Sequence, residues 1–178
     1  MLNLESAATT ISPWRKKYWD RLKELDLESE SLKSVPLKTL PFPLPARNHP
    51  HTHLSSPHLH KIVFIDGYLS LEHSHFPEEI VCLPMEEAMG AYPLFFQNLM
   101  MKTLREETDP LALLNGAFQG QGAFIYLPPK IEIASSLHIE HYFTGVSMGS
   151  PRLVFSLGKH SSIHVNSLPS NIRRIIRT

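Results

Sequence analysis

Short runs of alternating apolar and polar residues dominate the second half of the chain. The alternation holds, or nearly holds, in residues 124–127, 131–133 and 137–143, and a period of two is typical of a half-buried β-strand. The runs are separated by Pro128-Pro129 and by Ala134-Ser135-Ser136. Consecutive prolines fix φ and remove two backbone donors, so they join strands at a corner and cannot continue a ladder of hydrogen bonds. The pattern predicts short strands linked by corners.

The same alternation returns nearer the C-terminus. Leu153, Phe155 and Leu157 share one face of a predicted strand, and Ile163 and Val165 share one face of the next. A β-solenoid needs only corners between its short strands, because each strand stacks on the equivalent strand of the next coil, whereas a sandwich or meander needs hairpin turns. The corners favour a solenoid. An ordinary small β-sheet packed on helices is the alternative, and the spacing alone does not decide between the two.

Helical spacing of apolar residues marks the first half of the chain. Ser12-Pro13 is a helix start signal, and four apolar residues then fall on one helical face: Trp14, Tyr18, Leu22 and Leu25. Residues 84–107 predict a second helical stretch, which Pro93 breaks into two halves. Asp109-Pro110 repeats the start signal for a short helix over 111–118.

A β-hairpin and an extended connector complete the predicted elements. In residues 61–70, KIVFIDGYLS, a β-branched and aromatic run meets the tight-turn dipeptide Asp66-Gly67. Repeated prolines between residues 29 and 57 prevent any long regular element there. We therefore expect four segments, which are an amphipathic helix in 1–28, a Pro/His-rich connector in 29–60, the hairpin with helices in 61–120, and strands in 121–178.

The order of the motifs is more specific than any one of them. The hairpin sequence is followed by a hydrophobic helix, by LNGAF at 114–118, by GAFIYLP at 122–128, and by SPRLVFSLGKHSSIHV at 150–165. This order resembles the SufD family of the SUF iron–sulfur cluster assembly system, closely over residues 61–165 and loosely over the N-terminal helix. The stretch Ile65-Asp66-Gly67 looks more like SufD than like its paralogue SufB.

The resemblance implies an α+β fold in which an N-terminal helical region precedes the first rungs of a right-handed parallel β-helix. It also implies a non-catalytic scaffold that acts in a complex with a SufB-like paralogue and a SufC-like ATPase. We expect no cofactor bound by this chain alone, whereas an iron–sulfur cluster or iron would be handled by the full complex. Relatives continue through many more rungs, so we expect this chain to correspond to an N-terminal portion with a truncated β-helix core in 121–178. The residues implicated in cluster assembly lie beyond it, and none is carried over.

Charge and cysteine content narrow the range of functions. Seventeen basic residues balance seventeen acidic ones, so no global field attracts the chain to nucleic acid or to an anionic membrane. The N-terminus has no apolar signal core, and nowhere do 18 apolar residues run together, so we expect a cytoplasmic protein. Cys82 is the only cysteine, which excludes an internal disulfide and a cysteine cage from this chain alone. Its position between Val81 and Leu83 predicts a buried, inert thiol.

Five histidines crowd residues 49–60, namely His49, His51, His53, His58 and His60. Alternate residues of an extended segment point the same way, so imidazoles in this stretch could converge on zinc, nickel or copper. Pro50 and Pro57 interrupt any regular strand, however, and no nearby carboxylate is present to orient the rings. A surface loop is the simpler interpretation. The five histidines remain the candidate metal ligands, and a His-rich metal-binding module is the alternative function, together with a fragment that has no independent activity.

Other chemical signals are weaker still. A strand over 137–143 places His138 and His141 on opposite faces, and the pair His160 and His164 lacks the glutamate of a metalloprotease. The glycine-containing stretches 120–122 and 158–160 lack the remaining residues of dinucleotide and phosphate loops, so we expect no ATP hydrolysis by this chain. A β-helical enzyme acting on sugars ranks last, because only two carboxylates, Glu132 and Glu140, follow residue 110.

Overall fold

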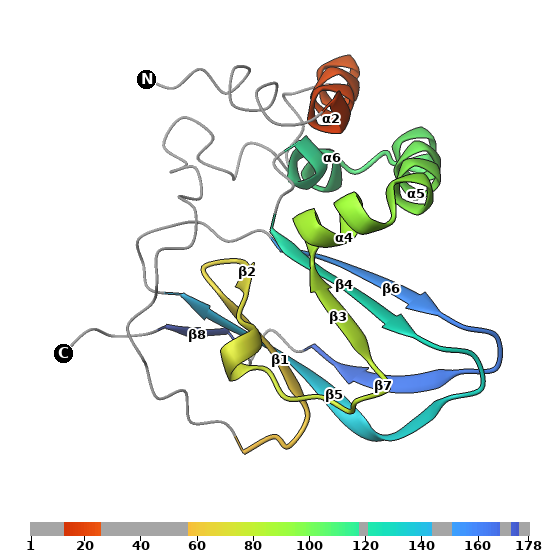
Figure 1. The fold of residues 1–178 in the computed structure, drawn as a ribbon. Coiled ribbons are helices and arrows are strands. Elements are labelled where there is room, and N and C mark those ends of the chain that lie inside the picture. Colours follow the sequence, from red (N-terminus) through yellow and green to blue (C-terminus); the bar gives the residue numbers. More distant parts are fainter. Residues whose placement is uncertain (1–12, 26–56, 118–120, 144–150, 168–171, 175–178) are drawn as a thin grey trace. The chain divides into compact units, whose positions relative to one another are not determined.

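The computed structural model describes residues 13–25, 57–117, 121–143, 151–167 and 172–174 (Figure 1). The fold is mixed α+β, and the chain divides into two compact units. Unit 1 draws on Met1–Leu40 and Met89–Gly120, and unit 2 draws on Pro41–Ala88 and Gln121–Thr178. Unit 1 is helical in its described part, whereas unit 2 contains a curled mixed β-sheet.

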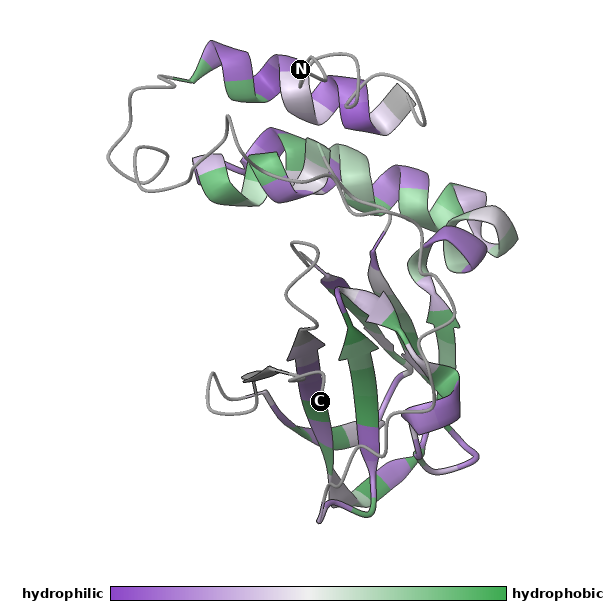
Figure 2. Cartoon of the chain, turned by 90° about the vertical axis from the view of Figure 1, so that its left-hand side faces the viewer, coloured by the Kyte–Doolittle hydropathy of each residue, from purple (hydrophilic) through white to green (hydrophobic). Residues whose placement is uncertain are grey.

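Unit 1 contains α2 (Pro13–Glu24), α5 (Pro93–Glu106) and α6 (Pro110–Ala117). The predicted apolar face of the first helix is confirmed, because Tyr18 and Leu22 are buried in a cluster with residues of α6. Most other residues of α2 are charged, and Figure 2 shows this helix as mostly purple. Gly116 in α6 faces the ring of Tyr18 so closely that a Cβ there would overlap it. The absence of a side chain at 116 thus allows α2 and α6 to approach.

Proline is the first residue of α2, α5 and α6, and the starts at Pro13 and Pro110 are those that the sequence predicts. The helix α4 (Met85–Ala91) ends just before Pro93, and Pro93 then occupies the first turn of α5, where its missing N–H leaves no hydrogen bond unmade. At the start of α6, the Asp109 carboxylate accepts a hydrogen bond from the backbone N–H of Leu111 at 2.9 Å. Among the described helices, none is both long enough and apolar enough to cross a bilayer.

In its described residues, unit 2 contains eight strands, one short 3-10 helix, Leu71–His73, and the first residues of α4. The strands are β1 (Lys61–Ile65), β2 (Tyr68–Leu69), β3 (Val81–Pro84), β4 (Gly122–Leu127), β5 (Glu132–Phe143), β6 (Arg152–Leu157), β7 (Ser162–Asn166) and β8 (Ile172–Arg174). The pairs β1–β2 and β3–β4 are antiparallel, whereas β1–β5, β2–β4, β4–β6, β5–β7 and β5–β8 are parallel. The predicted hairpin is confirmed, and its turn residues Asp66 and Gly67 have φ of 49° and 87°.

The main core of unit 2 lies between these strands. It is formed by nine buried residues: Ile62, Phe64, Ile80, Cys82, Ala123, Ile125, Leu127, Leu137 and Ile139. The predicted face of β7 is confirmed, because Ile163 and Val165 pack against this core. Of the predicted β6 face, Leu153 packs against the core, whereas Phe155 and Leu157 are exposed. Strand β3, which contributes Cys82, has no counterpart in the sequence-based prediction. Its four residues end in a proline, so the strand is too short to produce a recognisable alternation.

Strands β4 and β6 stack in parallel with a constant offset. Gly122 is the register partner of Arg152 and Leu127 that of Leu157, so every pair is separated by 30 positions (152 − 122 and 157 − 127). The turns that follow repeat this offset, because Lys130 and His160 (160 − 130) both have positive φ, 65° and 61°. The two turns are hydrogen bonded, with the N–H of Lys130 donating to the carbonyl of Lys159 at 3.0 Å. The corner predicted at Pro128-Pro129 therefore stacks on a second corner, which contains Lys159 and His160.

The prediction of two separate strands on either side of Ala134-Ser135-Ser136 is wrong. A single strand, β5, runs through these residues from Glu132 to Phe143. They produce an irregularity in pairing instead, because Ile133 pairs with Ile163 whereas Leu137 pairs with Val165, so β5 has two more residues than β7 over this interval. Alanine and serine keep their backbone N–H groups and accept extended dihedrals, so they bend a strand without ending it.

Candidate functional site

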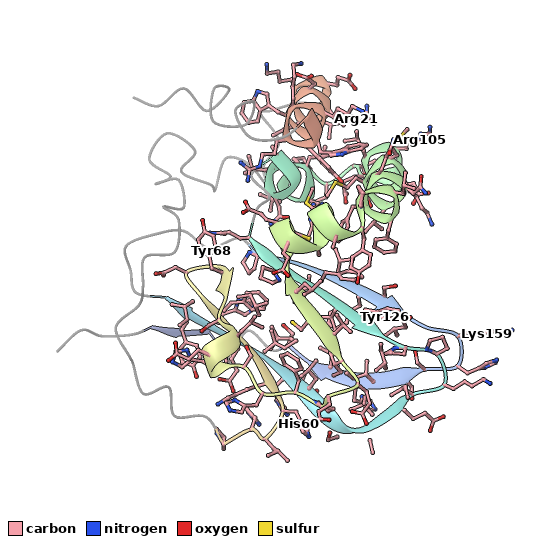
Figure 3. The ribbon with its side chains drawn as sticks, viewed as in Figure 1. Arg21, His60, Tyr68, Arg105, Tyr126 and Lys159 are labelled. Atoms are coloured by element: carbon pink, nitrogen blue, oxygen red, sulfur yellow. The ribbon has the colours of Figure 1, made fainter. Side chains whose placement is uncertain are left out.

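The predicted metal ligands divide between described and undescribed parts of the chain. His49, His51 and His53 lie outside the described residues. His58 and His60 are described and precede β1; Figure 3 labels His60 there. His58 stacks on the imidazole of His138, with ring centroids 3.6 Å apart and planes at 7°. The backbone carbonyl of His60 accepts a hydrogen bond from the N–H of His138 at 3.0 Å. Both residues thus contact β5.

This arrangement is not that of a metal centre. Within the described ranges, no three or more His, Cys, Asp or Glu side chains are grouped so that they could hold a metal ion, whereas zinc sites commonly use three or four protein ligands. In face-to-face rings the nitrogen lone pairs lie in two parallel planes, so they do not converge on one point between the rings. Metal binding by the five histidines as a set stays a prediction, since three of them are undescribed.

The stacked pair belongs to a row of ionisable side chains along β5. His138, Glu140 and Tyr142 occupy alternate positions on one face of the strand. The carboxylate of Glu140 is nearly inaccessible, at 2% exposure, and it accepts a hydrogen bond from the Tyr142 hydroxyl at 2.8 Å. We call these three residues, together with His58, the β5 polar row. It lies beside Val63 and Ile65 of β1, which are the register partners of Glu140 and Tyr142.

The electrostatics of the β5 polar row favour an uncharged His138. Desolvation lowers its pKa below the ordinary value, and the repulsion of a positive charge on His58 lowers it further. Glu140 acts in the opposite direction, since a nearby carboxylate favours the imidazolium. The net effect is a neutral ring at neutral pH, which is the form that stacks on His58 without charge repulsion.

His141 lies on the opposite face of β5, as the strand prediction requires. Its ring is stacked with that of Phe64 at 5.2 Å between centroids, next to the main core. Burial lowers the pKa of His141, so it too stays neutral. His160 and His164 are exposed. None of these histidines is paired with a nucleophile in any hydrogen bond that we identify in the described residues.

Cys82 is buried in the main core, and burial raises the pKa of its thiol to about 12. A nucleophilic cysteine needs a depressed pKa and access to solvent, so the prediction of a buried and unreactive thiol is supported on both counts. Cys82 therefore does not have the environment of a catalytic thiol. The distinctive features of the described residues are the β5 polar row and the parallel pairing of β4 with β6.

Comparison with known protein families adds a specific result to this geometry. Residues 57–139 match the family described as SufBD protein N-terminal region. The matched residues begin just before His58 and end within β5 at Ile139, so they include the hairpin, α4 to α6, β3 and β4. The match supports the resemblance noted in the sequence but does not distinguish SufB from SufD. No curated protein matches the chain.

Both stacked histidines, His58 and His138, lie within the residues that this family model matches. Sequence reasoning missed both this pairing and the buried Glu140–Tyr142 contact. The second had a usable signal, since alternate residues of a strand share a face and HIEHYF therefore places Glu140 and Tyr142 together. The first had none, because 80 positions separate the two rings (138 − 58).

Proposed function

We propose that this chain is a non-catalytic scaffold subunit for iron–sulfur cluster assembly, acting with a SufB-like paralogue and a SufC-like ATPase in the cytoplasm. The observation that carries the proposal is the SufBD match over residues 57–139. The described chemistry is compatible with it, because a scaffold acts by association and needs neither an activated thiol nor a carboxylate pair. Iron or a cluster would then be handled by the complex rather than by this chain alone.

The proposal includes a SufD-like identity and a β-helix. The sequence Ile65-Asp66-Gly67 forms the hairpin turn, and this stretch is the part that resembles SufD more than SufB. In favour of a right-handed parallel β-helix are the parallel β4–β6 and β5–β7 pairs and the turns repeated after 30 positions. Strands stacked in parallel at a fixed offset, with corners in place of hairpins, are typical of solenoid coils.

The experiment that tests the proposed function is co-purification. The tagged chain would be expressed with the SufB and SufC homologues of its own organism and purified at moderate salt, with and without ATP. We expect stoichiometric retention of the SufB homologue. Loss of both partners, in a chain whose circular dichroism shows that it is folded, would contradict the proposal.

A triple alanine variant of His49, His51 and His53 separates the scaffold from the metal-binding alternative. The scaffold proposal expects this variant to retain its partners as well as the unmodified chain does, because no step of the argument uses these side chains. If the variant loses its partners together with bound zinc, nickel or copper, measured by elemental analysis, the His-rich module becomes the better account. Lys102→Glu, on the exposed side of α5, is a suitable substitution control.

A further inference from the structure

One end of β1 brings polar side chains together from four segments of unit 2. Lys61, the first residue of β1, is the antiparallel bridge partner of His75 and the parallel register partner of His138. His138 is in turn the register partner of Asn166 in β7. Register partners present their side chains on the same face of a sheet. These four residues therefore form a row across the strands, at the end of β1 where Figure 3 labels His60.

The imidazole of His58 adds a second ring to this row. Its centroid lies 3.6 Å from that of His138. On the other side, the N–H of Lys61 donates to the carbonyl of His75 at 2.6 Å, and the N–H of His75 donates to the carbonyl of Lys61 at 2.9 Å. Neighbouring strands lie about 4.8 Å apart, so the Lys61 ammonium has imidazoles within reach on both sides. We call Lys61, His75, His58 and His138 the Lys61 cluster.

Lys61 and His75 lack a carboxylate partner in the described part of the chain, where their side chains form no ion pair and no hydrogen bond. Glu140 lies on the same face of β5, but it is 2% exposed and is hydrogen bonded to Tyr142. Three further acids flank His75 in sequence and are exposed: Glu72, Glu78 and Glu79. Natural proteins tolerate such an unbalanced group of basic side chains mainly at functional sites.

The Lys61 cluster lies where this face of the sheet becomes accessible. Val63 and Ile65, the next residues of β1 on the same face, are 0% and 2% exposed. Lys61 and His138 are partly buried, and His75 is exposed. A ligand at the cluster would therefore be partly shielded from water, and a lower local dielectric strengthens hydrogen bonds to charged groups.

The chemistry of the cluster indicates the class of ligand. A lysine ammonium has three donors and no acceptor, and an imidazole has at least one N–H donor in either protonation state. A metal ion is a poor occupant, because the described ranges contain no group of three metal-binding side chains. A phosphate group carries a charge of about −1.5 to −2 and three acceptor oxygens. It therefore matches more of these donors than a carboxylate does.

We propose that the Lys61 cluster binds a phosphate group. The Lys61 ammonium provides the positive charge, and N–H groups of His75 and of the stacked pair donate hydrogen bonds to the phosphate oxygens. Inorganic phosphate and the phosphate monoester of a small metabolite share this chemistry, so either is a source of the ligand. This inference does not depend on the proposed role in cluster assembly.

NMR titration of the full, ¹⁵N-labelled chain tests the inference at fixed pH and ionic strength. The probes are inorganic phosphate, ribose 5-phosphate and acetate, and the signals are the imidazoles and the backbone amides of β1 and β5. We expect saturating shifts at Lys61, His75 and His138 with phosphate, and at least about fivefold weaker binding of acetate. Tighter binding of ribose 5-phosphate than of inorganic phosphate would assign the ligand to a metabolite, and the reverse order to free phosphate.

Substitutions locate the binding. Lys61→Gln should weaken phosphate about tenfold, because it removes the charge from the hydrogen bond, whereas Lys61→Arg should retain binding within about threefold. His75→Ala should weaken phosphate about threefold. Lys102→Gln, the same loss of charge at an exposed position of α5, should change nothing. If Lys61→Gln lowers the thermal midpoint, His75→Ala decides instead, since His75 is exposed.

The inference fails if phosphate and acetate bind equally, if neither binds, or if the variant that decides behaves like Lys102→Gln. It also fails if zinc chloride alone shifts the same signals and saturates them at one equivalent, since the cluster would then be a metal site.

Discussion

Replacement of Gly122 by alanine tests the stacking of β4 on β6 directly. Gly122 has φ of 117°, a backbone conformation that residues with a Cβ rarely adopt, and it is the register partner of Arg152. A Cβ at this position would overlap the carbonyl oxygen of Arg152 and would lie 2.6 Å from its backbone nitrogen. These atoms belong to the main chain, so no side-chain rotation can relieve the overlap.

The expected cost follows from these two effects. Holding alanine in a disfavoured backbone conformation costs about 1–3 kcal/mol, and forced overpacking costs about 1–3 kcal/mol more. A loss of about 2–6 kcal/mol is large against the 5–15 kcal/mol that is typical of a folded domain. For a chain of this length it corresponds to a fall of about 5–20 °C in the thermal midpoint.

Scanning calorimetry and amide hydrogen exchange measure the two consequences of Gly122→Ala. We expect a lower midpoint and faster exchange in β4 and β6, with α2 and α6 as internal references. Gly90→Ala is the matched control, because a Cβ at Gly90 meets nothing within 4 Å and alanine favours a helix over glycine by about 0.5–1 kcal/mol. If Gly122→Ala unfolds like the unmodified chain while exchange in β6 stays slow, the argument for close β4–β6 stacking is refuted.

Three further predictions concern single residues. Gly116→Ala should destabilise unit 1 by about 1–3 kcal/mol in urea titrations followed by tryptophan fluorescence, because the fully buried ring of Tyr18 has no room to move; an unchanged midpoint would contradict this contact. Burial raises the pKa of Cys82 to about 12, so its thiol should not react with a disulfide reagent at pH 7 until urea is added. The stability that the buried neutral thiol contributes should be full below about pH 9 and should be lost as the pH rises toward 12. His138 has a lowered pKa, so NMR titration should show that its imidazole becomes protonated at a pH below the ordinary histidine pKa. The stability associated with the neutral imidazole should be present above the ordinary histidine pKa and should be lost as the pH falls through the pKa of His138 in the folded protein. His58→Ala should raise the pKa of His138, and a pKa that did not move would show that the stacked ring contributes no repulsion.

Local elements are the part of this protein that the sequence determined well. The proline-initiated helices, the break at Pro93 and the Asp66-Gly67 hairpin all follow from backbone chemistry within a few residues. Alternation likewise predicted that Ile163 and Val165 of β7 face the core, because the two faces of a strand are set by its own pleat. The division into segments 1–28, 29–60, 61–120 and 121–178 stays a prediction.

Features that depend on long-range pairing were decided only by the tertiary structure. The continuity of β5 through Ala134-Ser135-Ser136 depends on its pairing with β7 on both sides of these residues, at 132–133 and at 137–138, which no local pattern encodes. The contact of His58 with His138 exists because β1 pairs in parallel with β5, so residues distant in the chain become neighbours. The exposure of Phe155 and Leu157 has the same origin, since burial of a strand depends on which strand lies beside it. Backbone chemistry specifies each strand, whereas the pairing of strands, and with it the β5 polar row, depends on the free energy of the whole sheet.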